Sequence, residues 1–477
     1  MLLRLHPSGE PKPFAKNISA IFSARISSTG GIIGNMRKKL LFIFLIAFLI
    51  RLIALDQSLW LDEGVTARVV QSYNFLGILK HFSPFDFHPP LYYFFMKTWV
   101  LMFGTSVISL RLPSVLFSLL TGYVVYRIGK KLKSESLGFW SSVFFLFNPL
   151  ILYYSQEARM YIMATFLLTA SFLVFLDLDK RGVPVQSLFW FNVLTLLGFL
   201  TFYGSVFFIG TFYLVLLFKK KYRLLFLTLP GMVISMLSVF PLLSQQLEHS
   251  AEALHVVKNW SLVLGRAEVK NILLIPLKFT VGRISFYPKY LYYLVSGLCT
   301  FFVFYFVLKG FFMKKRIALF FFAPLLFGFV ISFFTPLLQY FRFLYVIPVM
   351  CILIALGTKK EWQRALVAFM FLSFSLAYVL FPNFHREDWG SLASSLPRKA
   401  IVYMIPSSAD ALTYYRKDLS IKDVRNIDGE ESKMIVIPYT SEIYGLDLVN
   451  VMNGFHYRSA KKENYRELTV EYWLRRD

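Results

Sequence analysis

The sequence predicts a polytopic α-helical membrane protein that ends in a small α/β domain. Three observations support this fold class. The 477 residues are 57% hydrophobic with a mean hydropathy of +0.57, which is more apolar surface than a soluble domain of this size can bury. Apolar runs long enough to cross a bilayer recur between residues 39 and 381, with Lys and Arg clusters between them. After Phe381 the composition is that of a soluble domain, with 14 Lys and Arg against 14 Asp and Glu.

Composition divides the chain into three parts. Residues 1–35 are polar and form a disordered or wrongly assigned extension, because the Met-Arg-Lys-Lys string at Met36 would itself be a good start for a membrane protein. Residues 36–381 form the membrane domain, and residues 382–477 form an external soluble α/β domain. In the membrane domain we expect about eleven transmembrane helices. They lie roughly at residues 39–55, 110–128, 136–153, 161–177, 187–202, 203–218, 224–243, 290–309, 317–334, 342–357 and 364–381.

The Lys and Arg clusters predict how the spans are oriented. With these spans, all clusters fall on one side, at residues 37–39, 130–133, 180–181, 219–223, 314–316 and 359–364. That side is cytoplasmic under the positive-inside rule. The extracytoplasmic side of the plasma (inner) membrane then receives residues 56–109, 154–160, 244–289, 335–341 and 382–477. The net charge of +24 lies wholly in residues 1–381, which suits anionic lipid head groups and gives no reason to expect nucleic acid as a partner.

The first external loop is expected to be folded. Its segment 91–103 is apolar but short and follows Pro89-Pro90. Counting it as a span would move every later basic cluster to the outside. We therefore expect a helix that lies in the outer interface, with its aromatic residues at head-group depth.

The external C-terminal segment has the pattern of an α/β domain. A helix-like stretch runs to Leu396, and residues 400–405 and 433–437 are predicted to be short buried strands. Cys299 and Cys351 both lie in apolar runs, so no disulfide framework is expected.

Asp62 and Glu63 are the most informative residues of the chain. They follow the first span, in a membrane domain that holds few acids, and paired carboxylates at the mouth of a span often mark a functional site. Taken alone, the pair could equally be solvated charges in an ordinary loop. No acid falls at mid-membrane, where an ion-coupled transporter would place ionisable groups. This distribution favours binding or chemistry at the outer membrane surface.

Four external segments gather acids, cations and aromatic residues on this face. They are residues 60–63, residues 88–93 with Lys97, residues 148–161 and residues 339–343. Cations would bind a phosphate, aromatic rings would stack on a sugar, and a carboxylate would act as a base. The combination suits a phosphate-bearing lipid and a sugar.

Four strings in this order resemble a known superfamily. W-x-D-E at Trp60, H-P-P-L-Y-Y at His88, R-L-P-S at Arg111 and Y-S-Q-E-A-R-M-Y at Tyr154 are similar to those of the polyprenyl-phosphate-sugar-dependent glycosyltransferases. This superfamily of the GT-C membrane fold includes the dolichyl-phosphate-mannose protein mannosyltransferases, the lipid A aminoarabinose transferases and the lipopolysaccharide-core galacturonosyl transferases. The resemblance covers about residues 40–380 and is strongest from 56 to 165. It implies transfer of a sugar from a polyprenyl-phosphate-linked donor to a hydroxyl of a protein, lipid or glycan, at the outer face and with inversion.

The resemblance also implies roles for individual residues. Asp62 matches the catalytic base, and Glu63 completes the same motif. Substrate-binding roles fall to His88, Tyr92, Lys97, Glu157, Arg159 and Arg342, of which the two arginines lie on the phosphate side. Simpler roles stay open: each arginine could anchor a span end, His88 could cap a turn, and Glu157 could pair with Arg159. A divalent metal is possible, although no residues have metal-ligand spacing.

Two other functions remain as alternatives. One is a polymerase or ligase of lipid-linked surface glycans, and the other is a polytopic transporter or flippase. No nucleotide-binding string is present, which suits direct displacement of a lipid phosphate. The C-terminal domain could recognise the acceptor or only cover the active site.

Overall fold

The computed structural model describes residues 36–178 and 183–476. By internal contacts the chain divides into two compact units, Met1–Ala47 and Phe48–Asp477. Residues 36–52 are helical, where the first span was predicted. The predicted extension at residues 1–35 lies outside the described residues. The second unit holds both the other membrane helices and the C-terminal sheet domain.

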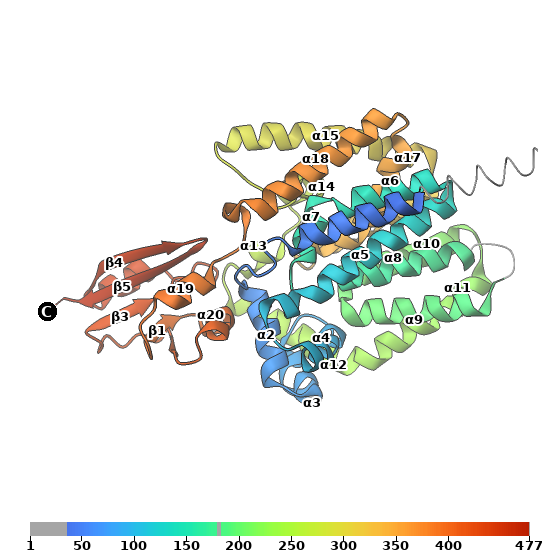
Figure 1. Ribbon diagram of the computed structural model, residues 1–477. Coiled ribbons are helices and arrows are strands. Elements are labelled where there is room, and N and C mark those ends of the chain that lie inside the picture. Colours follow the sequence, from blue (N-terminus) through green and yellow to red (C-terminus); the bar gives the residue numbers. More distant parts are fainter. Residues whose placement is uncertain (1–35, 179–182, 477) are drawn as a thin grey trace, which may run out of the picture. The chain divides into compact units, whose positions relative to one another are not determined.

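A helix covers each of the later predicted spans in the second unit (Figure 1). These helices are α5 (Val107–Leu132), α6 (Glu135–Leu146), α7 (Pro149–Ser155), α8 (Tyr161–Leu178), α9 (Val185–Thr201), α10 (Val206–Phe218), α11 (Tyr222–Thr228), α12 (Pro230–Val256), α15 (Lys289–Met313), α16 (Lys315–Ile331), α17 (Ile347–Gly357) and α18 (Glu361–Leu380). Among the described residues, six helices are long and apolar enough to cross a membrane, or up to seven if the bent pair α6 and α7 is one span. The mostly helical membrane fold is confirmed, and the count of about eleven spans stays a prediction.

Two of the predicted spans differ from the helices that cover them. The span predicted at 136–153 is broken, because α6 and α7 meet at 61°. Asn148 starts α7 by accepting hydrogen bonds from the backbone N–H groups of Leu150 and Ile151, and Pro149 follows at the first helical position. The span predicted at 224–243 continues as α12 to Val256. Its extra turns are rich in Gln, Glu, Leu and Ala, which favour helix even outside an apolar run.

The loop that the sequence predicts to be the first external one is folded, as predicted. It contains α2 (Leu61–Ser72), α3 (Phe75–Gly77), η1 (Ile78–Phe82), η2 (Ser83–Phe85) and α4 (Leu91–Phe103). Helix α4 has the predicted bounds: it follows Pro89-Pro90 and ends at Gly104, where φ is +73° and glycine is favoured. Tyr92 and Met96 are buried on one face of α4. Its depth in the interface stays a prediction.

The C-terminal segment folds as a five-stranded mixed sheet with helices. Its elements are α19 (Trp389–Ser395), β1 (Ile401–Met404), α20 (Asp410–Tyr415), β2 (Ser420–Asp423), β3 (Lys433–Val436), α21 (Leu448–Gly454), β4 (Tyr457–Tyr465) and β5 (Leu468–Arg475). The strand order is β2-β1-β3-β5-β4. β1 pairs in parallel with β2 and β3, and β5 pairs antiparallel with β3 and β4.

Alternation along the strands gives this sheet two buried faces. Val402 packs on one face with Trp389 and Leu412, from α19 and α20. Its neighbour Tyr403 packs on the other face with Met452 from α21. Both faces of the sheet are therefore covered by helices, as the runs of apolar residues in β1 and β3 require.

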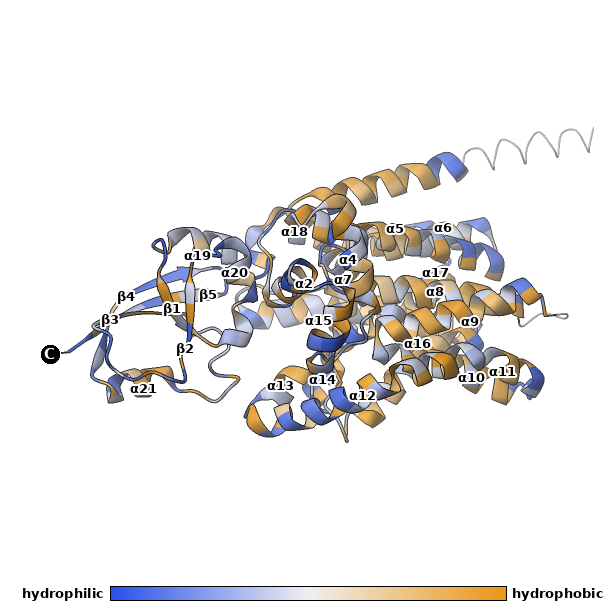
Figure 2. Ribbon diagram, turned by 90° about the horizontal axis from the view of Figure 1, so that it is seen from below, coloured by the Kyte–Doolittle hydropathy of each residue, from blue (hydrophilic) through white to orange (hydrophobic). Residues whose placement is uncertain are grey.

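The sheet domain joins the helical part at the end that carries α2 (Figure 1). In Figure 2, hydrophobic residues colour the long helices, whereas much of β4 and β5 is hydrophilic. The remaining elements are η3 (Tyr203–Ser205), α13 (Trp260–Leu264), α14 (Val269–Val281), η4 (Tyr340–Val346), η5 (Pro382–Phe384) and η6 (Pro406–Ser408).

Candidate active site

Asp62 and Glu63 lie in the first turn of α2, which Trp60 caps at its N-terminus. Negative charge is favourable there because the N-terminal end of a helix carries partial positive charge. The two acids nevertheless have different surroundings. The Asp62 side chain is 35% exposed and lines a cavity, whereas Glu63 is fully buried. Successive helical residues are rotated by about 100°, so adjacent acids in α2 face different neighbours.

Glu63 is held in a buried network. Arg111 donates from Nε to Glu63 Oε1 at 2.8 Å and from Nη2 to Oε2 at 2.5 Å. The backbone N–H of Ala158 also donates to Oε1, at 2.8 Å. The remaining N–H groups of Arg111 donate to the carbonyl oxygens of residues 55, 57 and 58. Three of the strings noted in the sequence, at 60–63, 111–114 and 154–161, thus meet at one buried ion pair.

Arg159 lies beside the exposed acid. Its Nη2 atom is 3.7 Å from Asp62 Oδ2, and its Nη1 donates to the Asp62 carbonyl oxygen at 3.3 Å. The Tyr93 hydroxyl accepts a second bond from Nη1, at 3.4 Å. Arg159 is 5% exposed and lines the cavity. It therefore fixes the first turn of α2 and places a positive charge next to the Asp62 carboxylate.

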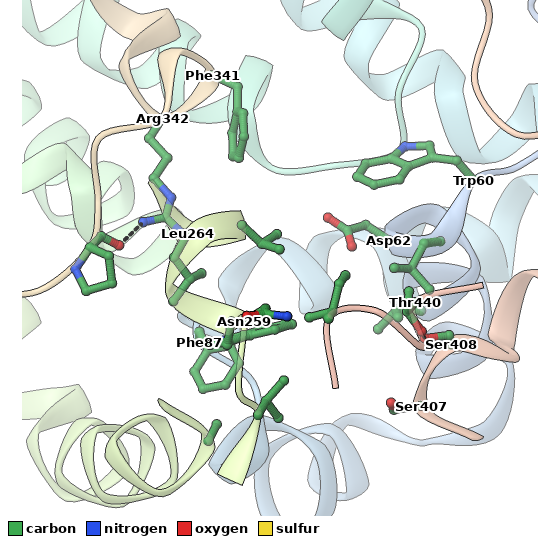
Figure 3. A pocket seen from close by; sticks show the side chains of 18 of the residues that line it. Trp60, Asp62, Phe87, Asn259, Leu264, Phe341, Arg342, Ser407, Ser408 and Thr440 are labelled. Carbon is green, nitrogen blue, oxygen red and sulfur yellow. Dashed lines mark hydrogen bonds between the residues drawn. The ribbon is translucent and has the colours of Figure 1, made fainter. Parts of the chain in front are cut away.

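The cavity has a volume of about 1800 Å³. Figure 3 shows Asp62 and Trp60 on one side of it and Arg342 on another, with Ser407, Ser408 and Thr440 of the C-terminal domain on the wall near Asp62. Arg342 donates from Nη1 to the Pro336 carbonyl oxygen at 3.3 Å. In addition to Arg159 and Arg342, the guanidinium groups of Arg283 and Arg386 line the cavity.

Another part of the cavity wall is apolar. It is formed by side chains of the helical part: Phe199, Phe207, Leu243, Leu247, Val263, Leu264 and Ile331. These residues come from α9, α10, α12, α13 and α16. The cavity thus combines cations with a large hydrophobic surface, which fits an amphiphilic anion.

Arg386 reaches the site from the linker between the membrane helices and the sheet domain. Its Cζ atom lies 3.4 Å from the centre of the Trp60 ring. Its Nη2 atom is 3.4 Å from Glu157 Oε1, and its Nε donates to the Tyr153 hydroxyl. Arg283 donates to the same hydroxyl from Nη1, at 2.9 Å. Two guanidinium groups therefore converge on the Tyr153 hydroxyl, and the Glu157 carboxylate lies beside one of them.

Burial shifts the pKa of three groups outside the spans. Burial raises the pKa of Glu157 to about 7, with Arg386 opposing the shift. Burial raises the pKa of Asp86 to about 6, with Arg159 opposing the shift. Burial lowers the pKa of His88 well below its usual range, and Arg159 and Arg342 lower it further. His88 is therefore a neutral imidazole at pH 7.

The structure brings only some of the predicted site residues to the cavity. Asp62, His88, Arg159 and Arg342 line it; Glu63, Tyr92, Lys97 and Glu157 do not. Tyr92 is buried in the first loop, and Lys97 donates to the Val70 carbonyl oxygen at 2.7 Å, which ties α4 to α2. Glu157 pairs with Arg386, not with Arg159.

Sequence reasoning missed several residues of the cavity wall. Arg283 lies in residues 244–289, a segment that was predicted to be external and that carries no motif. Arg386 and Glu387 lie in the charged string before Trp389, at the start of the C-terminal domain. The Tyr439 hydroxyl donates to Glu387 Oε1 at 2.8 Å. An excess of charged residues at a domain boundary was the available signal.

A metal site is not evident in the part of the chain that the structure describes. In residues 36–178 and 183–476, no group of three or more His, Cys, Asp or Glu side chains could hold a metal ion. We therefore assign no residue to a divalent metal.

Comparison with known proteins gives a family model and several structures. The model described as dolichyl-phosphate-mannose-protein mannosyltransferase matches residues 87–245. No curated protein matches the chain in sequence. ArnT from Cupriavidus metallidurans in the apo state is similar in structure, with a TM-score of 0.61 and 13% identity over 94% of this chain and 98% of that one.

Two liganded structures are also similar. ArnT from the same organism, bound to undecaprenyl phosphate, has a TM-score of 0.58 and 12% identity over 91% of this chain and 97% of that one. The archaeal oligosaccharyltransferase AglB from Archaeoglobus fulgidus, in complex with an inhibitory peptide and a dolichol-phosphate, has a TM-score of 0.52 and 12% identity over 85% of this chain and 70% of that one. These matches confirm the predicted GT-C fold and the resemblance to the mannosyltransferase superfamily.

Proposed function

We propose that this chain, which has the GT-C membrane fold, transfers a sugar from a polyprenyl-phosphate donor to a hydroxyl acceptor. One observation carries the proposal: a single cavity of about 1800 Å³ has the Asp62 carboxylate, four arginines and an extensive apolar wall on its surface. A base, phosphate-binding cations and a surface for a lipid chain are the parts that such a reaction needs. The acceptor is a protein, lipid or glycan.

The apolar wall suits the lipid part of the donor. Phe199, Phe207 and Leu243 belong to helices that the sequence predicts to span the membrane, so a polyprenyl chain could enter from the bilayer along this side. Two structures of similar fold hold undecaprenyl phosphate and dolichol-phosphate. They support a polyprenyl phosphate as the ligand of this cavity.

The guanidinium groups suit the phosphate of the donor. Arg159 and Arg342 were expected in this role from the sequence, and Arg283 and Arg386 also line the cavity. Guanidinium groups bind phosphate oxygens through strong, charge-assisted hydrogen bonds. As the bond between the anomeric carbon and the phosphate oxygen breaks, these cations neutralise the charge that develops on the leaving phosphate.

Asp62 is the proposed general base. Its carboxylate takes the proton of the acceptor hydroxyl while the acceptor oxygen attacks the anomeric carbon. The polyprenyl phosphate leaves from the opposite side with the electron pair of the broken bond, so the configuration at the anomeric carbon is inverted. Arg159 holds the Asp62 backbone and lies 3.7 Å from its carboxylate, which restrains the base in the cavity.

The proposed location follows the predicted topology. The cavity is lined by helices of the membrane domain, by loops that the sequence predicts to be external and by the C-terminal domain, so we place the reaction at the extracytoplasmic face of the plasma (inner) membrane. The donor would be a lipid-linked sugar within that membrane. The acceptor would reach the cavity from outside or from the outer leaflet.

A transfer assay tests the function. Purified protein is incubated with labelled polyprenyl-phospho-hexoses or -pentoses and with hydroxyl-bearing peptides, lipids or glycans. We expect label to move to one acceptor class in the wild type and not in Asp62→Asn. A wild type that moves lipid-linked sugar across vesicle membranes without forming a new glycosidic bond would instead identify a flippase.

A further inference from the structure

The C-terminal domain packs directly on the helix that carries Asp62. Helix α2 places Gly64 and Arg68 one turn apart, so the two residues share one face of the helix. Both meet α20, the first α-helix after strand β1, at Ala411 and Asp410. The contact lies within six residues of the proposed base.

Gly64 lets the two helix backbones touch. A Cβ atom added at Gly64 would lie 2.4 Å from the backbone nitrogen of Ala411 and 2.6 Å from its Cα. These neighbours are backbone atoms, which cannot rotate away as a side chain can. Any side chain at position 64 must therefore push α2 and α20 apart.

Arg68 forms the charged part of this contact. Its Nε donates to Asp410 Oδ2 at 2.7 Å, and the Asp410 side chain is 14% exposed. Asp410 is the first residue of α20, where a negative charge also suits the helix end. The ion pair thus fixes the direction of α20 relative to α2.

The chain just before α2 is tied to the same domain. Ser58 Oγ accepts a hydrogen bond from the backbone N–H of Gly390 at 2.9 Å. The backbone N–H of Leu59 donates to the Tyr415 hydroxyl, also at 2.9 Å. The C-terminal domain therefore holds the residues on both sides of Asp62 in sequence.

Contacts from the helical part hold other residues of α2. Glu63 binds Arg111, and the Thr66 hydroxyl lies 3.1 Å from the Ala158 carbonyl oxygen, to which it donates. Helix α2 is thus held between two parts of the structure. A displacement of the C-terminal domain would act on the first turn of α2 and so on the Asp62 carboxylate.

We propose that the C-terminal domain positions the catalytic carboxylate through an α2 clamp, formed by Gly64 against Ala411 and by Arg68 with Asp410. This inference rests on the proposed function, in which Asp62 is the base. The domain then does more than cover the cavity: it sets the geometry of the base. Reaction rates are sensitive to such placement, because a misplacement of about 1 Å can cost roughly a hundredfold in rate.

The test compares Gly64→Ala and Asp410→Ala with the conservative Asp410→Glu. Asp423→Ala is the matched control, because it removes another ion pair of the same domain. In that pair, Asp423 at the end of strand β2 contacts Arg425 in the turn that follows. We expect kcat to fall at least about tenfold in Gly64→Ala and Asp410→Ala, with donor KM unchanged. Asp410→Glu should recover most of kcat, and Asp423→Ala should behave as wild type.

Hydrogen–deuterium exchange provides a readout that does not need activity. Backbone amides of residues 61–66 should exchange faster in Gly64→Ala and Asp410→Ala, while the strands of the sheet stay protected. Unchanged kcat and unchanged exchange in α2 would overturn the clamp, and so would a uniform rise in exchange through the sheet, which indicates a general stability effect. A wild type without transferase activity would refute the proposed function, and the exchange measurement would still decide the clamp.

Discussion

The Arg111 guanidinium binds both oxygens of the Glu63 carboxylate in the interior of the protein. This pair separates the roles of two acids that are adjacent in sequence. Glu63 anchors α2 to α5 and to the backbone of Ala158. Asp62, one residue earlier, is left at the cavity surface.

Replacing Glu63 should therefore affect stability more than chemistry. Glu63→Ala leaves the buried Arg111 without its carboxylate, and breaking a buried ion pair usually costs about 3–5 kcal/mol. Thermal unfolding in detergent should show a large loss of stability in Glu63→Ala and little change in Asp62→Asn. A stable but inactive Glu63→Gln would instead assign Glu63 a part in the reaction.

Replacing Asp62 should stop turnover while donor binding persists. Asp62→Asn keeps the size of the side chain but removes its basicity, so turnover should fall by about 10²–10⁴-fold. The measurement is sugar transfer at saturating donor, together with donor affinity. Near-normal turnover would exclude Asp62 as the base.

Replacing Arg342 should weaken donor binding. Arg342→Ala removes a charged partner of the phosphate, and a hydrogen bond to a charged group contributes about 1.5–3 kcal/mol, or roughly tenfold or more in affinity. Binding of a polyprenyl phosphate without its sugar measures this effect directly. Arg266→Ala is the control, because Arg266 is an exposed arginine that lies outside the cavity wall. Equal affinities for both variants would remove Arg342 from the donor site.

The stability of the protein should depend on pH through Glu157. Burial raises the pKa of Glu157 from its ordinary value of 4.5 to about 7 in the folded protein. Between these values the folded state binds a proton that the unfolded state releases, so the contribution of Glu157 to the free energy of unfolding falls as pH rises. Melting temperatures between pH 4.5 and 7.5 should show this fall in the wild type and a flatter profile in Glu157→Gln. Glu430 is exposed, so the control Glu430→Gln should keep the wild-type dependence of melting temperature on pH.

The predicted orientation can be checked by cysteine labelling. In a background that lacks Cys299 and Cys351, an impermeant reagent added outside should label a cysteine at Ser394 and not one at Lys220. Both positions are exposed in the structure, so accessibility depends on the side of the membrane. Labelling at Lys220 but not at Ser394 would invert the topology.

Hydropathy, together with residues that typically start or end helices, predicted most of the fold. Apolar runs indicated the long helices, and the helix α4 has the predicted bounds because Pro90 and Gly104 start and end it. The break at Asn148 and Pro149 was missed. Both residues are start signals for a helix, but the surrounding apolar run masked them.

Sequence alone determined that the chain spans a membrane many times and that a sheet domain follows. It also predicted that Asp62 and Glu63 lie in a functional region, which stays a prediction. These conclusions depend on local properties, namely hydropathy, charge and short motifs. Only the tertiary structure decided which acid lines the cavity, that Lys97 ties α4 to α2, and that Arg283 and Arg386 join the site. Arg386 and Trp60 are more than three hundred residues apart in sequence, yet the Arg386 Cζ atom lies 3.4 Å from the centre of the Trp60 ring. Such contacts arise from tertiary packing, so they cannot be predicted from local sequence patterns.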